Sequence, residues 1–185
     1  MEKKDGIVSL SARDRRTLKS RAYELSKVEE HLIDNNADSI FVVKFLLSDE
    51  VYGIETSFIK EVLPLKDLTV VPCTPDFILG VINIRGQIFT VINPKKILML
   101  PEKGISEFTK VMILSYENIS FGIVADAILG NQYIANSEIG SLPYVKSDIK
   151  RDYLVGATAK GVIILNAKAF MSSSELVVNQ ENKKR

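Results

Sequence analysis

Arg85 is the first residue in this sequence whose chemistry needs an explanation. It precedes Gly86 between two apolar runs, residues 81–84 and 88–92. A guanidinium carries a permanent charge and five donors in a fork that fits a carboxylate. Glu61 offers a carboxylate inside another apolar stretch, IKEVL. We hypothesise that Glu61 and Arg85 approach each other as a bidentate pair, which would shape a groove beside the hairpin. The alternative is that both are solvated turn charges.

Residues suited to catalysis or metal binding are scarce. The sequence has one histidine, His31, and one cysteine, Cys73, so one of each cannot assemble a zinc site or an obvious nucleophilic site. Glycine-rich phosphate-binding loops are absent. Cys73 lies between two prolines and is expected to pack as a small apolar residue. We predict no catalytic residues, no metal and no cofactor, although an unrecognised enzyme site at Cys73 or Ser115 stays open.

Composition favours a soluble globular protein. The 185 residues are 46% hydrophobic and 25% charged, with a net charge of +1, so no overall field favours nucleic acid or an acidic membrane. The N-terminus lacks the apolar stretch of a signal peptide, and no apolar run approaches the ~20 residues of a membrane span. We expect a cytoplasmic protein without membrane insertion. Lys95-Lys96 and Lys150-Arg151 are interpreted as ordinary surface pairs, which gives nucleic acid no evident groove.

The N-terminal part, residues 1–38, differs from the rest of the chain. Apolar residues spaced three, four and seven apart predict an amphipathic helix at about 11–35, with His31 on its surface. Its apolar side docks on the rest of the protein or on a partner, or else the helix is solvated and frayed. The apolar residues in question are Leu18, Ala22, Leu25, Val28 and Leu32.

From residue 40 to residue 171, short apolar runs alternate with turn signals, which is typical of a β-protein. Hairpins are expected at 40–54, 81–92, 111–124 and 153–165, and a short helix or strand at 58–63. Nine or ten strands and few helices give a mostly-β fold, with two small barrels sharing an interface. A short helix is expected at 167–171, followed by a flexible polar tail at 174–185.

Several ordered motifs resemble those of the CheW family, the adaptors of bacterial and archaeal chemotaxis. The stretch GVINIRGQIFTVINP, residues 80–94, resembles the family hallmark around N-L-R-G. Tyr52-Gly53-Ile54 with the following IKEV segment resembles an upstream family motif. The resemblance covers residues 40–171 and also includes Thr69 to Pro75, Gly122 to Asp126 and Tyr153 to Gly156.

This resemblance implies two SH3-like β-barrel subdomains sharing a core, with the CheW-like domain at residues 39–173. It implies a non-enzymatic adaptor that couples the cytoplasmic hairpin tip of chemoreceptors to the regulatory domain of the histidine kinase CheA. The matching positions would form the receptor groove, where at least one of the two apolar residues must instead pack in the core. These positions are Ile59, Glu61, Val62, Asn83, Arg85 and Gly86.

The sequence also departs from the family pattern. Thr90 replaces a proline, and Asn93 and Asn166 replace aspartates, so acceptor strength is lost while hydrogen-bonding capacity is kept. One alternative is therefore a divergent adaptor serving a pilus or another non-flagellar pathway. A small β-barrel enzyme and a single-strand-binding module are the alternatives from other classes.

Overall fold

The computed structural model describes residues 38–102, 104–142 and 151–173. The chain divides into two compact units, Met1–Ser39 and Ile40–Arg185, and the described elements belong almost wholly to the second. The expected N-terminal helix with His31, the residue Lys150 and the expected polar tail lie outside the described residues. Arg151, the described member of its pair, is exposed as interpreted.

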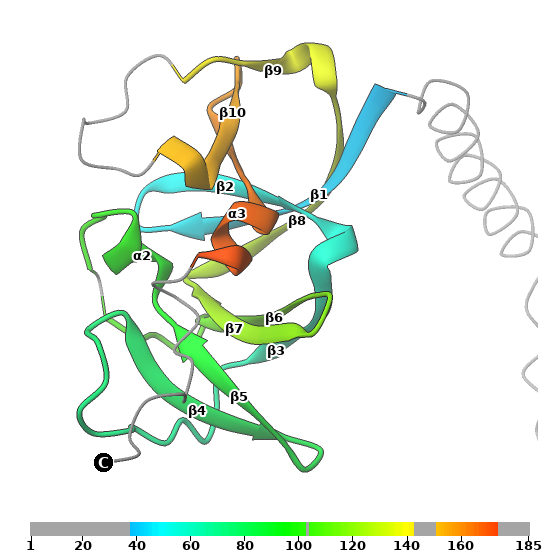
Figure 1. Cartoon of the computed structure of the whole chain (residues 1–185). Helices are drawn as coiled ribbons and strands as arrows, with labels where there is room; N and C mark the ends of the chain where they lie inside the picture. The colour runs from blue at the N-terminus through cyan, green and yellow to red at the C-terminus, as the bar shows by residue number, and fades with distance from the viewer. Residues whose placement is uncertain (1–37, 103, 143–150, 174–185) are drawn as a thin grey trace, which may run out of the picture. The chain divides into compact units, whose positions relative to one another are not determined.

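Two sheets build the second unit, so the mostly-β prediction is confirmed (Figure 1). The first sheet has six strands in the order β8-β1-β2-β11-β10-β9. Alternating burial along β1 shows one face turned to the core. The six strands are β1 Ser39–Leu47, β2 Glu50–Glu55, β8 Ala127–Ala135, β9 Ile139–Gly140, β10 Leu154–Thr158 and β11 Val162–Leu165.

The second sheet has five strands in the order β3-β6-β7-β5-β4. Its two hairpins, β4–β5 and β6–β7, have two-residue turns between runs of β-branched and aromatic residues. The strands are β3 Ile59–Pro64, β4 Ile78–Ile84, β5 Gln87–Ile92, β6 Lys110–Tyr116 and β7 Ile119–Ala125.

Each sheet takes strands from both halves of the chain. Hairpin β4–β5 joins the sheet of β6 and β7 through a parallel pairing of Val91 with Gly122. Hairpin β10–β11 joins β1 and β2 through a parallel pairing of Ile164 with Gly53. The long connections are what parallel pairing requires, since a tight hairpin cannot make it.

Short helices follow the two joining hairpins. The segments are α2 Pro94–Ile97 after β5 and α3 Ala167–Ser172 after β11, with single 3₁₀ turns η2 Thr56–Phe58, η3 Asn136–Glu138 and η4 Arg151–Tyr153. The side chain of Asn93 accepts the Lys95 backbone N–H, and that of Asn166 accepts the Ala169 N–H. Both asparagines that depart from the family pattern are therefore helix N-caps.

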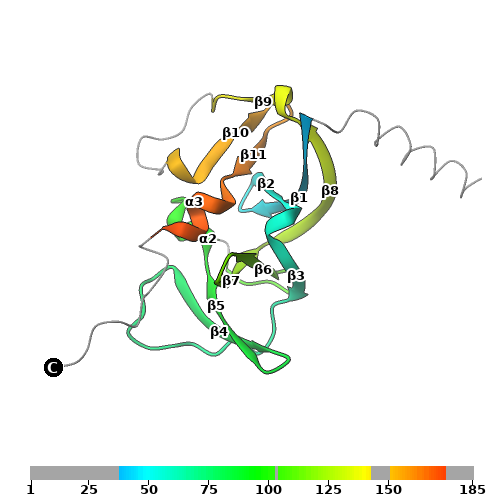
Figure 2. The same cartoon turned by 45° about the vertical axis from the view of Figure 1, so that its right-hand side comes forward.

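One large apolar core joins the two sheets. Phe45 and Tyr52 enter it from the first sheet, Ile92 and Phe121 from the second, and Phe170 from α3. The rings of Phe121 and Phe170 lie 6.3 Å apart, centroid to centroid. Two smaller clusters fill the space behind β4–β5 and beside β8. The helices α2 and α3 lie between the sheets in Figures 1 and 2.

The structure confirms some of the predicted local elements and contradicts others. The expected hairpins and the helix at α3 are confirmed, and residues 58–63 form η2 and strand β3. The helix α2 was missed, because four residues are too few to show a helical period. The prediction that Cys73 packs as an apolar residue is wrong: its side chain is exposed and its φ is 59°. Pro72 and Pro75 have no backbone N–H to donate, so this segment could not satisfy its hydrogen bonds in the core. It forms a turn at the surface instead.

Candidate binding site at the β4–β5 hairpin

The β4–β5 turn consists of Arg85 and Gly86, whose φ angles are 50° and 85°. Two consecutive positive φ values make a type I′ turn, the kind that matches strand twist in a two-residue hairpin. The Asn83 side-chain oxygen accepts the Gly86 N–H at 2.9 Å. Gly86 takes this conformation freely, whereas Arg85 does so at some cost. Asn83 and Gly86 thus fix the direction in which Arg85 leaves the turn.

Arg85 meets Glu61, as hypothesised. Its Nη2 lies 2.8 Å from Glu61 Oε1, with the arginine side chain 81% exposed and the glutamate side chain 24% exposed. One hydrogen bond forms the pair instead of the expected two. Strands β3 and β4 stand at opposite ends of the sheet order, so the ion pair connects the two edge strands of this sheet.

A small hollow of about 60 Å³ lies beside this pair. The Nζ atom of Lys60 lies 5.6 Å from the centre of the Phe89 ring and donates a 3.4 Å hydrogen bond to Gln87. A cation above an aromatic face is weakly attracted to it. The hollow is lined by Lys60, Glu61, Ile84, Arg85, Gln87, Phe89 and Ile113.

The two apolar residues predicted for the groove separate as expected. Ile59 packs against the main core, whereas Val62 is 39% exposed. Sequence reasoning missed Lys60, Gln87 and Phe89. Their only sequence signal was adjacency: Lys60 precedes Glu61, and Gln87 follows the turn.

A second ion pair lies inside the protein. Lys95 Nζ is 2.5 Å from Asp126 Oδ1, and the two side chains are only 5% and 20% exposed. The other Asp126 oxygen accepts the Ser48 backbone N–H at 2.7 Å, and the Asp126 N–H donates to the Leu46 carbonyl. Asp126 therefore ties the β1–β2 turn to α2. The interpretation of Lys95 as a surface residue is wrong, because the Asn93 cap starts α2 with this side chain turned inward.

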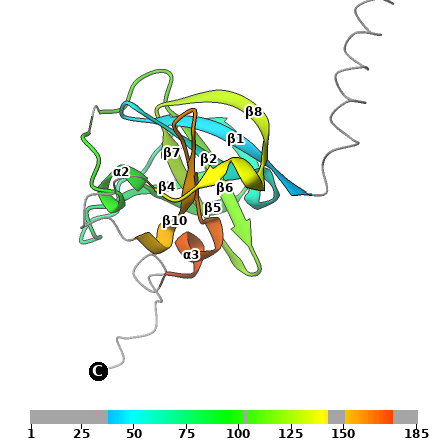
Figure 3. The same cartoon turned by 90° about the horizontal axis from the view of Figure 1, so that it is seen from above.

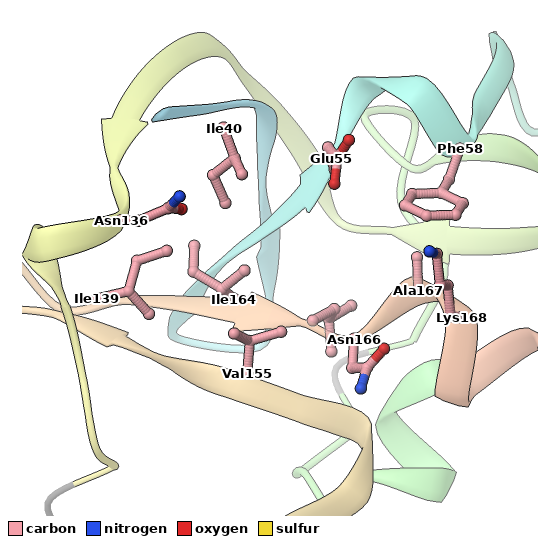
Figure 4. A pocket seen from close by; sticks show the side chains of 11 residues that line it. Ile40, Glu55, Phe58, Asn136, Ile139, Val155, Ile164, Asn166, Ala167 and Lys168 are labelled. Atoms are coloured by element: carbon pink, nitrogen blue, oxygen red, sulfur yellow. The ribbon is translucent and has the colours of Figure 1, made fainter. Parts of the chain in front are cut away.

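A larger hollow of about 210 Å³ lies against the first sheet (Figure 4). Apolar side chains of Ile40, Ile139, Val155 and Ile164 point toward a common space, with Asn166 to one side. Glu55 and Lys168 also line the hollow, so it combines apolar contact surface with one carboxylate and one ammonium group at its margin.

The potential metal ligands of the described part of the chain are dispersed. Within residues 38–102, 104–142 and 151–173, no three His, Cys, Asp or Glu side chains are grouped so that they could bind a metal ion. No helix in this same part of the chain is both long and apolar enough to cross a membrane.

Comparison with known proteins defines the class. The model of the CheW-like domain family matches residues 42–175, and the chain belongs to this family. It is 29% identical over 148 residues to the chemotaxis protein CheW of Treponema pallidum, covering 76% of this chain and 87% of that one. It is 30% identical over 139 residues to the chemotaxis protein CheW of Klebsiella aerogenes, covering 72% and 82%.

A solved structure agrees with this assignment. The crystal structure of the scaffolding protein TtCheW from Thermoanaerobacter tengcongensis is similar at a TM-score of 0.62 and 28% identity, over 71% of this chain and 87% of that one. The family assignment made from the motifs is confirmed.

Proposed function

We propose that this chain is a non-enzymatic chemotaxis adaptor, located in the cytoplasm, that couples chemoreceptors to the histidine kinase CheA. Its relatives carry the names chemotaxis protein and scaffolding protein. The observation that carries the proposal is the Arg85–Glu61 pair, because a highly exposed arginine is fixed by a carboxylate beside apolar surface. Such a site suits binding of a protein surface.

The proposed architecture is two SH3-like barrels sharing a core, at residues 39–173 between an N-terminal extension, 1–38, and a tail, 174–185. Closure of the second sheet by the Thr69–Val81 bridge supports the barrel form. In the first sheet, β8 and β9 stand at the two ends of the sheet order yet are joined by the single turn η3. This connection brings the C-terminal end of β8 close to the two-residue strand β9.

The residues of the site have separate proposed roles. Arg85 and Glu61 keep the shape of the groove, and Asn83 and Gly86 set the turn that presents the arginine. Val62 offers apolar surface to a helical hairpin of the receptor. Ile59 packs in the core beneath, where it anchors β3.

Binding to two purified partners tests the proposal. A receptor cytoplasmic fragment and the CheA regulatory domain are titrated against the wild type and Arg85→Ala by calorimetry. Loss of the groove shape is expected to weaken receptor binding about tenfold, or about 1.4 kcal/mol, while CheA binding is unchanged. Lys160→Ala, at the tip of the β10–β11 hairpin, is the matched control.

The exchanged pair Arg85→Glu with Glu61→Arg separates shape from direct contact. If the pair only shapes the groove, the exchange restores most of the receptor affinity. Binding of neither partner by the wild type would refute the adaptor proposal. A panel of receptor fragments distinguishes flagellar from pilus or other pathways, and no described feature favours the enzyme or the single-strand-binding alternative.

A further inference from the structure

Strand β8 differs from the other edges of the two sheets. Edge strands with unused backbone groups attract other chains, and proteins usually protect them. Strand β3 is protected by Lys60, Glu61 and Pro64, and β9 has only two residues. Strand β4 is covered near its middle, where Val81 exchanges backbone hydrogen bonds of 2.8 and 2.9 Å with Thr69.

Strand β8 has none of these protections in the part of the chain that the structure describes. Its nine residues, AILGNQYIA, contain no charged residue and no proline. Strand β1 pairs with one side, and no other described strand pairs with it. At its end, the Ala135 N–H donates to Glu138. In Figures 2 and 3, β8 lies at the outer margin of the sheet, beyond β1.

The outer face of β8 is apolar as well as open. Leu129 is 47% exposed and Tyr133 is 38% exposed, although both are large hydrophobic residues. The Tyr133 ring stacks on Phe41 of β1 with 4.4 Å between centroids, which fixes its direction. Ile134 is buried on the other face and anchors the strand. An open backbone edge beside exposed apolar side chains is typical of an interface.

The order of residue types in β8 identifies the partner. It is nearly the same in both directions from Asn131, so the strand is complementary to an antiparallel copy of itself. We propose that a second copy of this chain pairs β8 with β8 about a two-fold axis at Asn131. The facing pairs would be Ala127 with Ala135, Ile128 with Ile134, Leu129 with Tyr133, Gly130 with Gln132, and Asn131 with itself.

This arrangement satisfies the edge in the manner that isologous dimers require. Leu129 of each copy faces Tyr133 of the other on the outer face, which is a favourable aliphatic–aromatic cross-strand pair. The two Asn131 amides meet at the axis and can hydrogen-bond to each other. Nothing lies within 4 Å of a Cβ added to Gly130, which leaves room for Gln132 of the other copy, while the φ of 103° makes the strand locally irregular at this one pair. One strand pair is a small interface, so we expect a dissociation constant on the order of 10–100 µM.

Sedimentation equilibrium of the full chain tests the proposal. The weight-average mass should rise from 20.6 kDa toward twice that value as concentration increases from about 1 µM to about 1 mM. Asn131→Lys places two ammonium groups opposite each other and should weaken the dimer at least about tenfold. Met99→Lys, at a 65% exposed residue outside β8, adds the same charge and should leave the dimer unchanged.

Cysteine cross-linking tests the register. In a Cys73→Ser background, Asn131→Cys should form a disulfide-linked dimer under mild oxidation, because its two copies face each other across the axis. Leu129→Cys should cross-link much more slowly, since it faces Tyr133. The proposal is overturned if the wild type stays monomeric throughout, if Asn131→Lys dimerises as the wild type does, or if both cysteines cross-link equally.

Discussion

The two joining hairpins, β4–β5 and β10–β11, are built alike and end differently. The third residue of each hairpin is a glycine in close backbone contact, Gly80 or Gly156, and each hairpin leads into an asparagine-capped helix. Their tips differ: Arg85 is bound by Glu61, whereas Lys160 has no described ion pair. What the hairpins share is what the fold needs, and the tip in which they differ is where we propose the partner-binding site.

The likeness extends to the strands that receive these hairpins. Strand β2 contains Tyr52-Gly53-Ile54 and β7 contains Phe121-Gly122-Ile123. Each central glycine lies opposite a residue of the incoming parallel strand, Ile164 or Val91. Both halves of the domain therefore place a glycine opposite the incoming parallel strand. Matching positions in the two halves can be mutated in parallel and their effects compared.

The largest effect is expected where the halves are most alike. A Cβ added to Gly80 or Gly156 would overlap the carbonyl of Thr69 or Gly140, and Gly80 also has a φ of 148°. Alanine at either glycine should lower the free energy of unfolding by about 3 kcal/mol. Gly86→Ala meets no atom within 4 Å and should cost only about 1 kcal/mol.

Urea unfolding followed by circular dichroism measures these differences. Equal, small losses at all three glycines would contradict the claim that Gly80 and Gly156 are equivalent points of close approach.

The lysines that follow the two caps should differ strongly. Lys95→Ala leaves the partly buried Asp126 without its cation and should cost about 3 kcal/mol of unfolding free energy. Lys168, at the same place after Asn166, is exposed with its Nζ 5.6 Å from the Tyr116 ring centre. Lys168→Ala should therefore cost less than about 1 kcal/mol. Similar midpoints for both variants in the same urea titration would argue against a distinct role for the buried pair.

Replacement of either N-cap asparagine, Asn93 or Asn166, should lower stability by a similar amount. Asn93→Ala and Asn166→Ala each remove one side-chain acceptor from a helix start and should cost about 1 kcal/mol. Asn→Asp at either position restores the residue of the family pattern and keeps the cap, so we expect a change under about 0.5 kcal/mol. Thermal denaturation provides the comparison. Strong destabilisation by aspartate would show that these asparagines do more than cap.

The smallest difference concerns Tyr52, where the other half has Phe121. The Tyr52 hydroxyl donates to Glu50 at 2.7 Å, so Tyr52→Phe should cost roughly 1 kcal/mol. Burial, with the Glu50 hydrogen bond and charge, raises the pKa of Tyr52 far above its ordinary value. Above about pH 10 the unfolded chain loses this proton first, so stability falls as pH rises.

Tyr52→Phe should remove that alkaline decline and leave stability below about pH 9 independent of this group. Urea titrations at several pH values between about 8 and 11 measure the slope. An unchanged slope in the variant would assign the decline to other groups.

Local chemistry determined which features the sequence could predict. The β4–β5 hairpin was predictable because Gly86 lies between two β-branched runs, and the Arg85–Glu61 contact because a guanidinium in such a place needs an acceptor. The buried Lys95–Asp126 pair was not, since its partners are brought together only by the packing of α2 on the β1–β2 turn. The exposure of Cys73 likewise depends on where the turn lies, which apolar character alone does not give.

The exchange of strands between the halves also governs how the protein is made. Strand β2 acquires its parallel neighbour β11 only after residue 165 has been synthesised. In a nascent chain, the β1–β2 hairpin is therefore synthesised well before β11, the strand with which β2 pairs. Non-local pairing of this kind slows folding and leaves strand edges open meanwhile. Chains truncated near residue 150 should consequently remain protease-sensitive at β1, β2 and β8, whose sheet lacks β10 and β11, whereas β3 to β7 already have all their neighbours.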